Sequence, residues 1–325
     1  MDANIDLTVE DILNFSKEKK FEYIDSIRIE YKRLLDMKTS ILEIFENNKY
    51  SKEPDGFILE GCTGSGKSTL LDLIEEEFSE RQEECITKKE LVRVTVPPNP
   101  TVISFLKSTL RGMRDPRYDK GTKYTLLDQI ISKSDMCGIH YVLFDEFHEL
   151  VNSSSQKVIT EVSDIFKYII KKCNWSTVLC GTSGGPENVV ASNTQLFRLF
   201  EDSLELKPFT YIIDDVETIK EWNTLLFEIE TKLPLKNRSY LDDSDISYRI
   251  FYASQGLISW TMKLLRNASK KSISAGREYI TKDDLAHSFT SYLAPKRRKI
   301  RNPFEFDPPY PPPPLPRFLF QYQSS

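Results

Sequence analysis

Short apolar runs alternate with longer segments of helical periodicity through the first two thirds of the chain. The runs at 56–60, 91–96, 141–146 and 176–182 predict strands, because they are short and rich in branched or aromatic side chains. The segments at about 69–84, 101–112, 124–136 and 156–172 have the apolar spacing of helices. Buried strands that alternate with helices favour an α/β fold with three layers around a mostly parallel sheet.

The pattern changes at three places, which predicts four parts of the chain. Residues 1–50 are predicted to form an N-terminal helical segment, and residues 51–210 are predicted to form the α/β core. Residues 211–294 are helical only and predict a small C-terminal helical lid. Residues 295–325 open with five basic residues among the six from 296 to 301, followed by a proline-rich tract. This composition predicts an extended, flexible tail.

The overall composition is that of an ordinary globular protein, with 39% hydrophobic and 29% charged residues among 325. No apolar run approaches the roughly 18 residues of a membrane span, and the acidic N-terminus does not look like a signal peptide. The five cysteines form no C-x-x-C pair, which favours free thiols in a reducing compartment. We therefore expect a cytoplasmic protein with no membrane partner. The net charge of −5 means that any nucleic-acid surface must be a local basic patch.

The segment from Gly61 to Ser68 fits the phosphate-loop pattern G-x-x-x-x-G-K-[ST] and lies between a predicted strand and a predicted helix. A turn in this position directs backbone N–H groups and the positive end of the helix dipole toward a polyphosphate. Lys67 is expected to reach the β- and γ-phosphates of ATP, and the Ser68 hydroxyl to bind Mg²⁺. A glycine-rich surface turn would leave Lys67 and Ser68 unexplained. The predicted nucleotide-binding residues are Gly61, Cys62, Thr63, Gly64, Ser65, Gly66, Lys67, Ser68 and Thr69.

Two carboxylates follow the apolar run that begins at Tyr141. Because ligands of open α/β sheets bind at the carboxyl ends of the strands, we expect Asp145 to hold Mg²⁺ and Glu146 to act as general base on the attacking water. Thr182, after the next strand, is a candidate to position that water. Its alternative role is that of a simple strand-to-turn residue before Gly184.

Arg198 lies in a predicted helix beyond that strand. A guanidinium presented to the γ-phosphate of a neighbouring subunit would stabilise the transition state, as arginine fingers do. The alternative is a surface salt bridge to Glu201 or Asp202.

A strip of basic residues follows the predicted start of a helix at Thr101, opposite its apolar side. Such a strip can bind DNA phosphates without recognising bases, or it can be only a solvated face. The candidate DNA-binding residues are Lys107, Arg111, Arg114, Arg117, Lys120 and Lys123.

The order of these parts resembles the AAA+ ATPases, and the sequence is similar to one branch, the TnsC/TniB regulators of transposition, including those of CRISPR-associated transposons. The phosphate loop and the Asp145-Glu146 strand are generic to AAA+ proteins. The stretches that select the branch are Pro97-Pro98-Asn99-Pro100-Thr101, Gln195-Leu196-Phe197-Arg198 and Gly256-Leu257-Ile258-Ser259. The resemblance covers roughly residues 20–293.

The resemblance implies a bacterial, nucleoid-associated ATPase that oligomerises as a ring or helical filament on double-stranded DNA and links a target-selector protein to the transposase. Family members often carry paired arginines in the Gln-Leu helix, whereas this chain has Arg198 followed by Leu199. Asn302-Pro303-Phe304 and the proline tract resemble docking peptides, and we expect the tail to recruit the transposase. Two alternatives remain: an initiator- or loader-like ATPase of replication, and a binding module switched by nucleotide with negligible turnover.

Overall fold

The computed structural model describes residues 8–51, 55–83, 86–152, 156–191, 196, 198–200, 202–297 and 300–320. By its internal contacts the chain divides into two compact units. The helical unit comprises Met1–Tyr31 and Pro208–Arg317, and the sheet unit comprises Lys32–Lys207 and Phe318–Ser325. The helical unit combines the N-terminal residues with the C-terminal helices, which the sequence ranges keep apart. The domain bounds predicted from the sequence therefore stay predictions.

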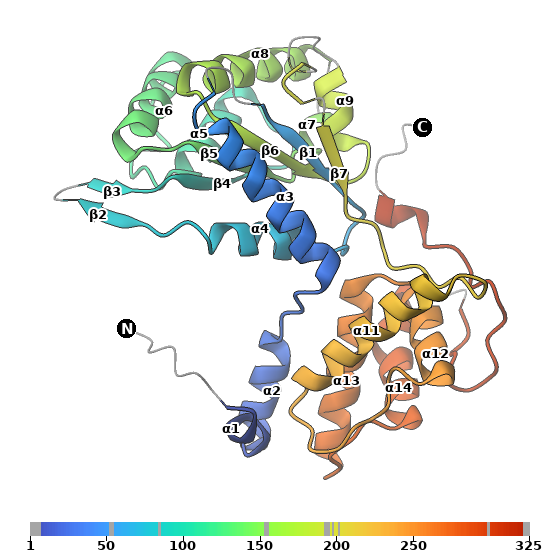
Figure 1. The fold of residues 1–325 in the computed structure, drawn as a ribbon. Coiled ribbons are helices and arrows are strands. Elements are labelled where there is room, and N and C mark those ends of the chain that lie inside the picture. Colours follow the sequence, from blue (N-terminus) through green and yellow to red (C-terminus); the bar gives the residue numbers. More distant parts are fainter. Residues whose placement is uncertain are drawn as a thin grey trace. The chain divides into compact units, whose positions relative to one another are not determined.

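In the described part of the sheet unit, five parallel strands pair in the order β4-β5-β6-β1-β7. The strands are β1 (Phe57–Glu60), β4 (Leu91–Thr95), β5 (Tyr141–Asp145), β6 (Ser176–Gly181) and β7 (Asp202–Glu205). The helices of this unit are α3 (Lys32–Asn48), α4 (Lys67–Glu75), α5 (Val102–Gly112), α6 (Lys123–Cys137), α7 (Glu149–Asn152), α8 (Gln156–Cys173) and α9 (Gly185–Ala191). Figure 1 shows α5, α6 and α8 on one face of the sheet and α3 and α4 on the other, which makes the three predicted layers.

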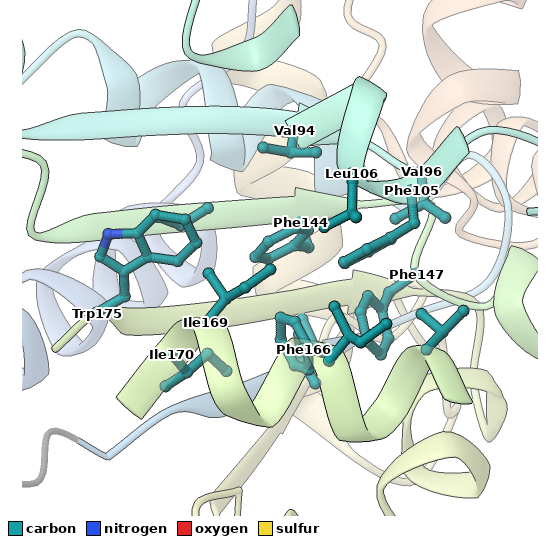
Figure 2. Packing of buried hydrophobic residues seen from close by; sticks show 14 of the residues in the cluster. Val94, Val96, Phe105, Leu106, Phe144, Phe147, Phe166, Ile169, Ile170 and Trp175 are labelled. Atoms are coloured by element: carbon teal, nitrogen blue, oxygen red, sulfur yellow. The ribbon is translucent and has the colours of Figure 1, made fainter. Parts of the chain in front are cut away.

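The main core lies between the sheet and the layer of α5, α6 and α8. Alternate strand residues such as Val94 and Phe144, which pair across β4 and β5, point into it. Phe166 of α8 lies 5.0 Å from Phe144 and 6.0 Å from Phe105 between ring centroids, both edge to face. Figure 2 shows these rings gathered between the strands and α8. The opposite face has a smaller aromatic cluster, in which Phe45 of α3 stacks on Tyr141.

Two features of the sheet unit differ from the sequence prediction. The helix expected over 69–84 ends at Glu75, where three consecutive acidic residues lie at the negative end of the helix dipole. An antiparallel hairpin of β2 (Arg81–Glu83) and β3 (Ile86–Lys88) follows it. The edge strand β7 was also not expected, because its sequence Asp-Ser-Leu-Glu is polar. It forms by pairing with the buried strand β1.

The helical unit contains the N-terminal helices and those that follow residue 210. Its elements are α1 (Val9–Leu13), α2 (Lys17–Ser26), α11 (Val216–Lys232), α12 (Ser244–Ser254), α13 (Ile258–Ser274), α14 (Lys282–Ser288), η1 (Phe289–Leu293) and η2 (Ala294–Lys296). Arg266 of α13 donates to the carbonyl of Ile27 at 2.5 Å and so holds the end of α2. No helix in the described ranges combines the length and the apolar character that crossing a membrane requires.

The segment that follows η2 makes specific contacts with the helical unit. Arg249 of α12 donates to the Pro303 carbonyl at 2.6 Å and to Asp307 at 2.7 Å. Phe304 is buried, with 5% of its surface exposed. Arg297 is buried as well and donates to the carbonyls of Tyr252 and Ala253. The basic and proline-rich end of the chain therefore has a defined path in its described part.

We predict that Phe166→Ala lowers the free energy of unfolding by about 3–5 kcal/mol, because it removes a ring from the centre of the main core. Tyr168→Ala is the matched control, since Tyr168 lies on the same helix with 45% of its surface exposed. Urea unfolding followed by circular dichroism measures both. Equal effects of the two substitutions would contradict the placement of this core.

Candidate nucleotide-binding site

The phosphate loop connects the end of β1 to the start of α4. Gly64 and Gly66 have φ of +85° and +108°, backbone conformations that residues with a Cβ rarely adopt. A Cβ on Gly61 would lie 2.6 Å from Ser65 Oγ and 2.7 Å from the Leu206 carbonyl. The glycines of the motif are therefore required by the path of the loop itself.

Lys67 is the first residue of α4, and its side chain turns back over the loop. Its Nζ donates to the carbonyls of Gly61 at 2.7 Å and Cys62 at 3.1 Å. Ser68 is exposed and Thr69 half-buried in the same helical turn. The loop therefore combines a helix N-terminus, an ammonium group and an accessible hydroxyl, which together suit an anion with a bound cation.

Asp145 is the last residue of β5, and each of its two carboxylate oxygens accepts a hydrogen bond. Oδ1 accepts the backbone N–H of Glu146 at 2.9 Å, and Oδ2 accepts Nη2 of Arg93 at 2.5 Å. Glu146 has a φ of +57°, an uncommon conformation for a residue with a side chain. This conformation turns the chain sharply at the strand end, and 49% of the Glu146 side chain is exposed.

The carboxyl ends of β1 and β5 share one electrostatic environment. Burial raises the pKa of Glu146, and the charge of Asp145 raises it further. Lys67 and Arg93 act in the opposite direction on the same pKa. The phosphate-loop lysine therefore lies close enough to Glu146 to influence its ionisation, so the structure brings together the two halves of the predicted site.

Thr182 follows β6, the strand between β1 and β5. It is 4% exposed, and its Oγ1 has no hydrogen-bond partner among the described residues. Its backbone N–H donates to Nδ1 of His148 at 3.4 Å. Burial lowers the pKa of His148, which favours the neutral ring that this hydrogen bond needs. A buried hydroxyl that has no partner in the described part of the chain suits contact with a ligand or water at this edge.

The donor set fits a magnesium nucleotide. Ser68 and Asp145 offer hydroxyl and carboxylate oxygens, and Mg²⁺ in proteins commonly takes one or two such ligands together with phosphate oxygens and water. The loop amides and the buried Thr182 hydroxyl fit the phosphate end of the same molecule.

Glu60, the last residue of β1, was not predicted from the sequence. Its carboxylate is buried and accepts the backbone N–H groups of Gly184 at 2.9 Å and Glu187 at 3.5 Å. Glu60 thus fixes the turn after Thr182 directly beside the phosphate loop. A charged residue at the end of an apolar strand was the available signal.

Arg93, in β4, was also missed. Besides Asp145 it contacts Asp72 of α4 at 2.6 Å, so that it joins the strand end to the phosphate-loop helix. A cation in the otherwise uncharged run from Leu91 to Val96 was the signal. Its role depends on neighbours that are distant in the sequence.

The remaining predicted residues lie elsewhere in the sheet unit. Arg198 is exposed in a turn after Leu196, and half of its predicted helix, including Glu201, lies outside the described residues. In the basic strip, Lys107 is half-buried on α5, and the Arg111 guanidinium lies 4.7 Å from the centre of the Tyr118 ring. Arg114 pairs with Glu80 at 2.8 Å. The other three residues of the strip, two exposed and one half-buried, are Arg117, Lys120 and Lys123.

Comparison with known proteins identifies the family of the chain. The sequence profile described as "Bacterial TniB protein" matches residues 20–210, more than half of the chain. The chain belongs to the TniB family. The match confirms the resemblance found in the sequence, and the matched range contains every predicted catalytic and nucleotide-binding residue. A search of curated protein sequences finds no match.

Solved structures similar to this TniB-family chain include ORC and Cdc6 proteins. The Aeropyrum pernix ORC2 protein in its ADPNP–ADP complexes is 14% identical, with 86% of this chain and 74% of that chain covered and a TM-score of 0.60. Cdc6p from Pyrobaculum aerophilum is 15% identical (84% and 71% covered, TM-score 0.60). The Aeropyrum pernix ORC1 protein in complex with DNA is 14% identical (85% and 70%, TM-score 0.62). The fold is therefore the AAA+ P-loop fold, as predicted.

We predict that Glu60 makes stability depend on pH, because burial raises its pKa above the value of the unfolded chain. The unfolded state then loses this proton at lower pH than the folded state, so Glu60 stabilises less as the pH rises from the ordinary glutamate value through the raised one. The free energy of unfolding of Glu60→Gln, relative to the wild type, should increase across this window.

Urea titrations at a series of pH values between about 4 and 7 measure this difference. Glu83→Gln, which removes an exposed carboxylate, controls for the loss of one negative charge. A difference that falls as the pH rises would contradict the environment described for Glu60.

Proposed function

We propose that the chain is an ATP-dependent, DNA-binding oligomer that regulates transposition in the bacterial cytoplasm, linking target-site selection to the transposase. The observation that carries this proposal is the convergence of Lys67, Asp145, Glu146 and Thr182 at one edge of an AAA+ sheet, in a chain of the TniB family. The similar ORC2 structure, which holds ADPNP and ADP, supports a nucleotide at this edge.

The residues divide the chemistry of ATP hydrolysis among them. The loop amides and Lys67 bind the phosphates, and Ser68 and Asp145 hold the magnesium ion. When bound, this ion neutralises charge on the transferred phosphoryl group. Glu146, whose carboxylate is half-exposed, takes a proton from the attacking water, and Thr182 Oγ1 orients that water. Arg198 serves the γ-phosphate of an adjacent subunit, for which its exposed position in a turn is suitable.

Duplex DNA binds to the basic strip through phosphate contacts. Lys107 and Arg111 lie four residues apart on α5, so their side chains share one side of the helix. Arg114 contributes less charge because it pairs with Glu80. The similar ORC1 structure is a complex with DNA, which supports a DNA-binding role for this fold in the TniB chain. The transposase and a target-selector protein are the protein partners, and the tail is a contact for the transposase.

A second candidate function is an initiator- or loader-like role in replication. It is favoured by the fold, since the similar ORC and Cdc6 structures cover 84–86% of this chain. Electron microscopy of the purified chain with duplex DNA and a non-hydrolysable ATP analogue separates the two. Continuous rings or filaments on DNA of any sequence support the transposition regulator. Binding confined to particular origin-like sequences, without filaments, would support the initiator.

We predict that Glu146→Gln lowers the kcat of ATP hydrolysis about 10²- to 10⁴-fold while leaving ATP affinity nearly unchanged, because only the general base is lost. Lys67→Ala is the contrasting variant and should lose affinity. Phosphate release and binding of a fluorescent ATP analogue measure the two quantities. Equal turnover by the wild type and Glu146→Gln would favour a nucleotide switch that does not depend on hydrolysis.

We predict that Lys107→Ala with Arg111→Ala weakens DNA binding equally for unrelated sequences and reduces the slope of log K against log salt by about 2, or nearly one for each lost phosphate contact. Fluorescence anisotropy at several salt concentrations measures this slope. Lys171→Ala, at an exposed position of α8, is the control for loss of a surface lysine. A slope unchanged from the wild type would remove the strip from the DNA interface.

A further inference from the structure

Arg93 connects three elements of the sheet unit around Asp145. Its Nη2 donates to Asp145 Oδ2 at 2.5 Å, and its Nη1 donates to Asp72 Oδ1 at 2.6 Å. The same Nη1 lies 3.7 Å from Glu75 Oε2. One guanidinium therefore contacts a strand-end carboxylate and two carboxylates of the phosphate-loop helix.

The sheet register explains why Arg93 can reach Asp145. Thr95 pairs with Asp145 across β4 and β5, and Arg93 pairs with Leu143. Because side chains alternate along a strand, all four point to the face that α4 covers. The Arg93 side chain is 20% exposed and that of Asp145 only 9%, so water screens this contact less than a surface ion pair.

Nη1 of Arg93 contacts α4, the helix that also carries Ser68. Asp72 comes four residues after Ser68 on α4, one turn further along the same side. Arg93 thus ties Asp145 to the helix of the other side chain that we assign to magnesium. The planar fork of a guanidinium suits two carboxylates at once, which the point charge of a lysine does not.

We propose that Arg93 is a positioning residue that sets both the geometry and the metal affinity of Asp145. The proposal rests on the proposed function, since it concerns the magnesium ion of bound ATP. Two opposite effects follow. The guanidinium fixes Asp145 for turnover, and its positive charge offsets the negative charge that attracts a divalent cation.

Arg93→Gln separates these two effects. Without the charge, the complex with a non-hydrolysable ATP analogue should bind Mn²⁺ about three- to tenfold more tightly, as followed by electron paramagnetic resonance. Without the two hydrogen bonds from the guanidinium to Asp145 and Asp72, kcat at saturating metal should fall about tenfold or more. A merely structural role would weaken metal binding and turnover together.

Two further variants keep the test valid if Arg93→Gln does not fold. Arg93→Lys retains the charge without the fork and should bind Mn²⁺ within about twofold of the wild type while turning over more slowly. Asp72→Asn removes one anchor, and it should lower kcat without changing the affinity for ATP in EDTA. Arg81→Gln, on the exposed hairpin, is the control.

Weaker Mn²⁺ binding by Arg93→Gln, or no change in either quantity, would overturn the proposal. If the wild type binds Mn²⁺ and the analogue but does not hydrolyse ATP, the proposed hydrolysis fails. The Mn²⁺ affinities still decide the role of Arg93 in that case.

An independent observation concerns the short 3₁₀ helix η3 (Arg317–Phe320). The carbonyl of Leu319 accepts the backbone N–H of Thr63, in the phosphate loop, at 2.9 Å. The Leu319 side chain is 4% exposed. The C-terminal segment therefore occupies an amide of the loop whose amides bind phosphates in proteins with this motif.

We infer that residues 316–320 restrain the phosphate loop and lower its affinity for nucleotide. Deletion of residues 316–325 and the variant Leu319→Asp should each bind a fluorescent ADP about two- to tenfold more tightly than the wild type, as expected when one competing hydrogen bond is lost. Deletion of residues 321–325 alone keeps η3 and is the matched control.

Equal ADP affinities in all four proteins, or weaker binding after deletion of residues 316–325, would overturn this inference. Circular dichroism establishes that each variant is folded. Failure of every form to bind ADP would instead contradict the proposed nucleotide site.

Discussion

The parallel pairing of β5, β6 and β1 is the constraint on which the rest of the structure depends. Parallel strands place their carboxyl ends at the same edge, so the phosphate loop, the Asp145-Glu146 pair and Thr182 meet there although they are far apart in the sequence. A slip of one residue would exchange the two buried faces of a strand, so that the side chains of the main core would point into the opposite layer. Phe144 and its partners in the main core therefore fix the positions of the polar side chains at the strand ends.

Local charge, and not net charge, determines what this edge can bind. The chain carries a net charge of −5, yet the positive charges of Lys67 and Arg93 both oppose the rise in the pKa of Glu146 that burial and Asp145 cause. Arg93 is bound to Asp145 and Asp72, while Glu60 is buried against the turn after Thr182. These contacts hold the carboxylates in defined positions before any ligand arrives, which is what preorganised catalysis requires.

The sequence predicts the elements with a strong apolar pattern, and it fails where a contact distant in the chain decides the structure. The strands at 91–96, 141–146 and 176–182 are found to within one residue at each end. β7 is polar and exists through its pairing with β1, and its sequence alone gave no sign of a strand. Arg93 and Glu60 could not be recognised from the sequence, because their roles depend on contacts with Asp145 and Gly184, which are distant in the chain. The contacts of Arg249 with the segment after residue 300 could not be predicted for the same reason.

We propose that Lys67, Ser68, Asp145 and Glu146 surround one magnesium nucleotide. A crystal structure of the chain with Mn²⁺ and a non-hydrolysable ATP analogue tests it most directly, because the anomalous signal of manganese locates the ion. We expect a manganese peak between Ser68 and Asp145, with the γ-phosphate facing Glu146 and Thr182. A nucleotide bound away from the phosphate loop, or a manganese peak distant from both Ser68 and Asp145, would contradict it.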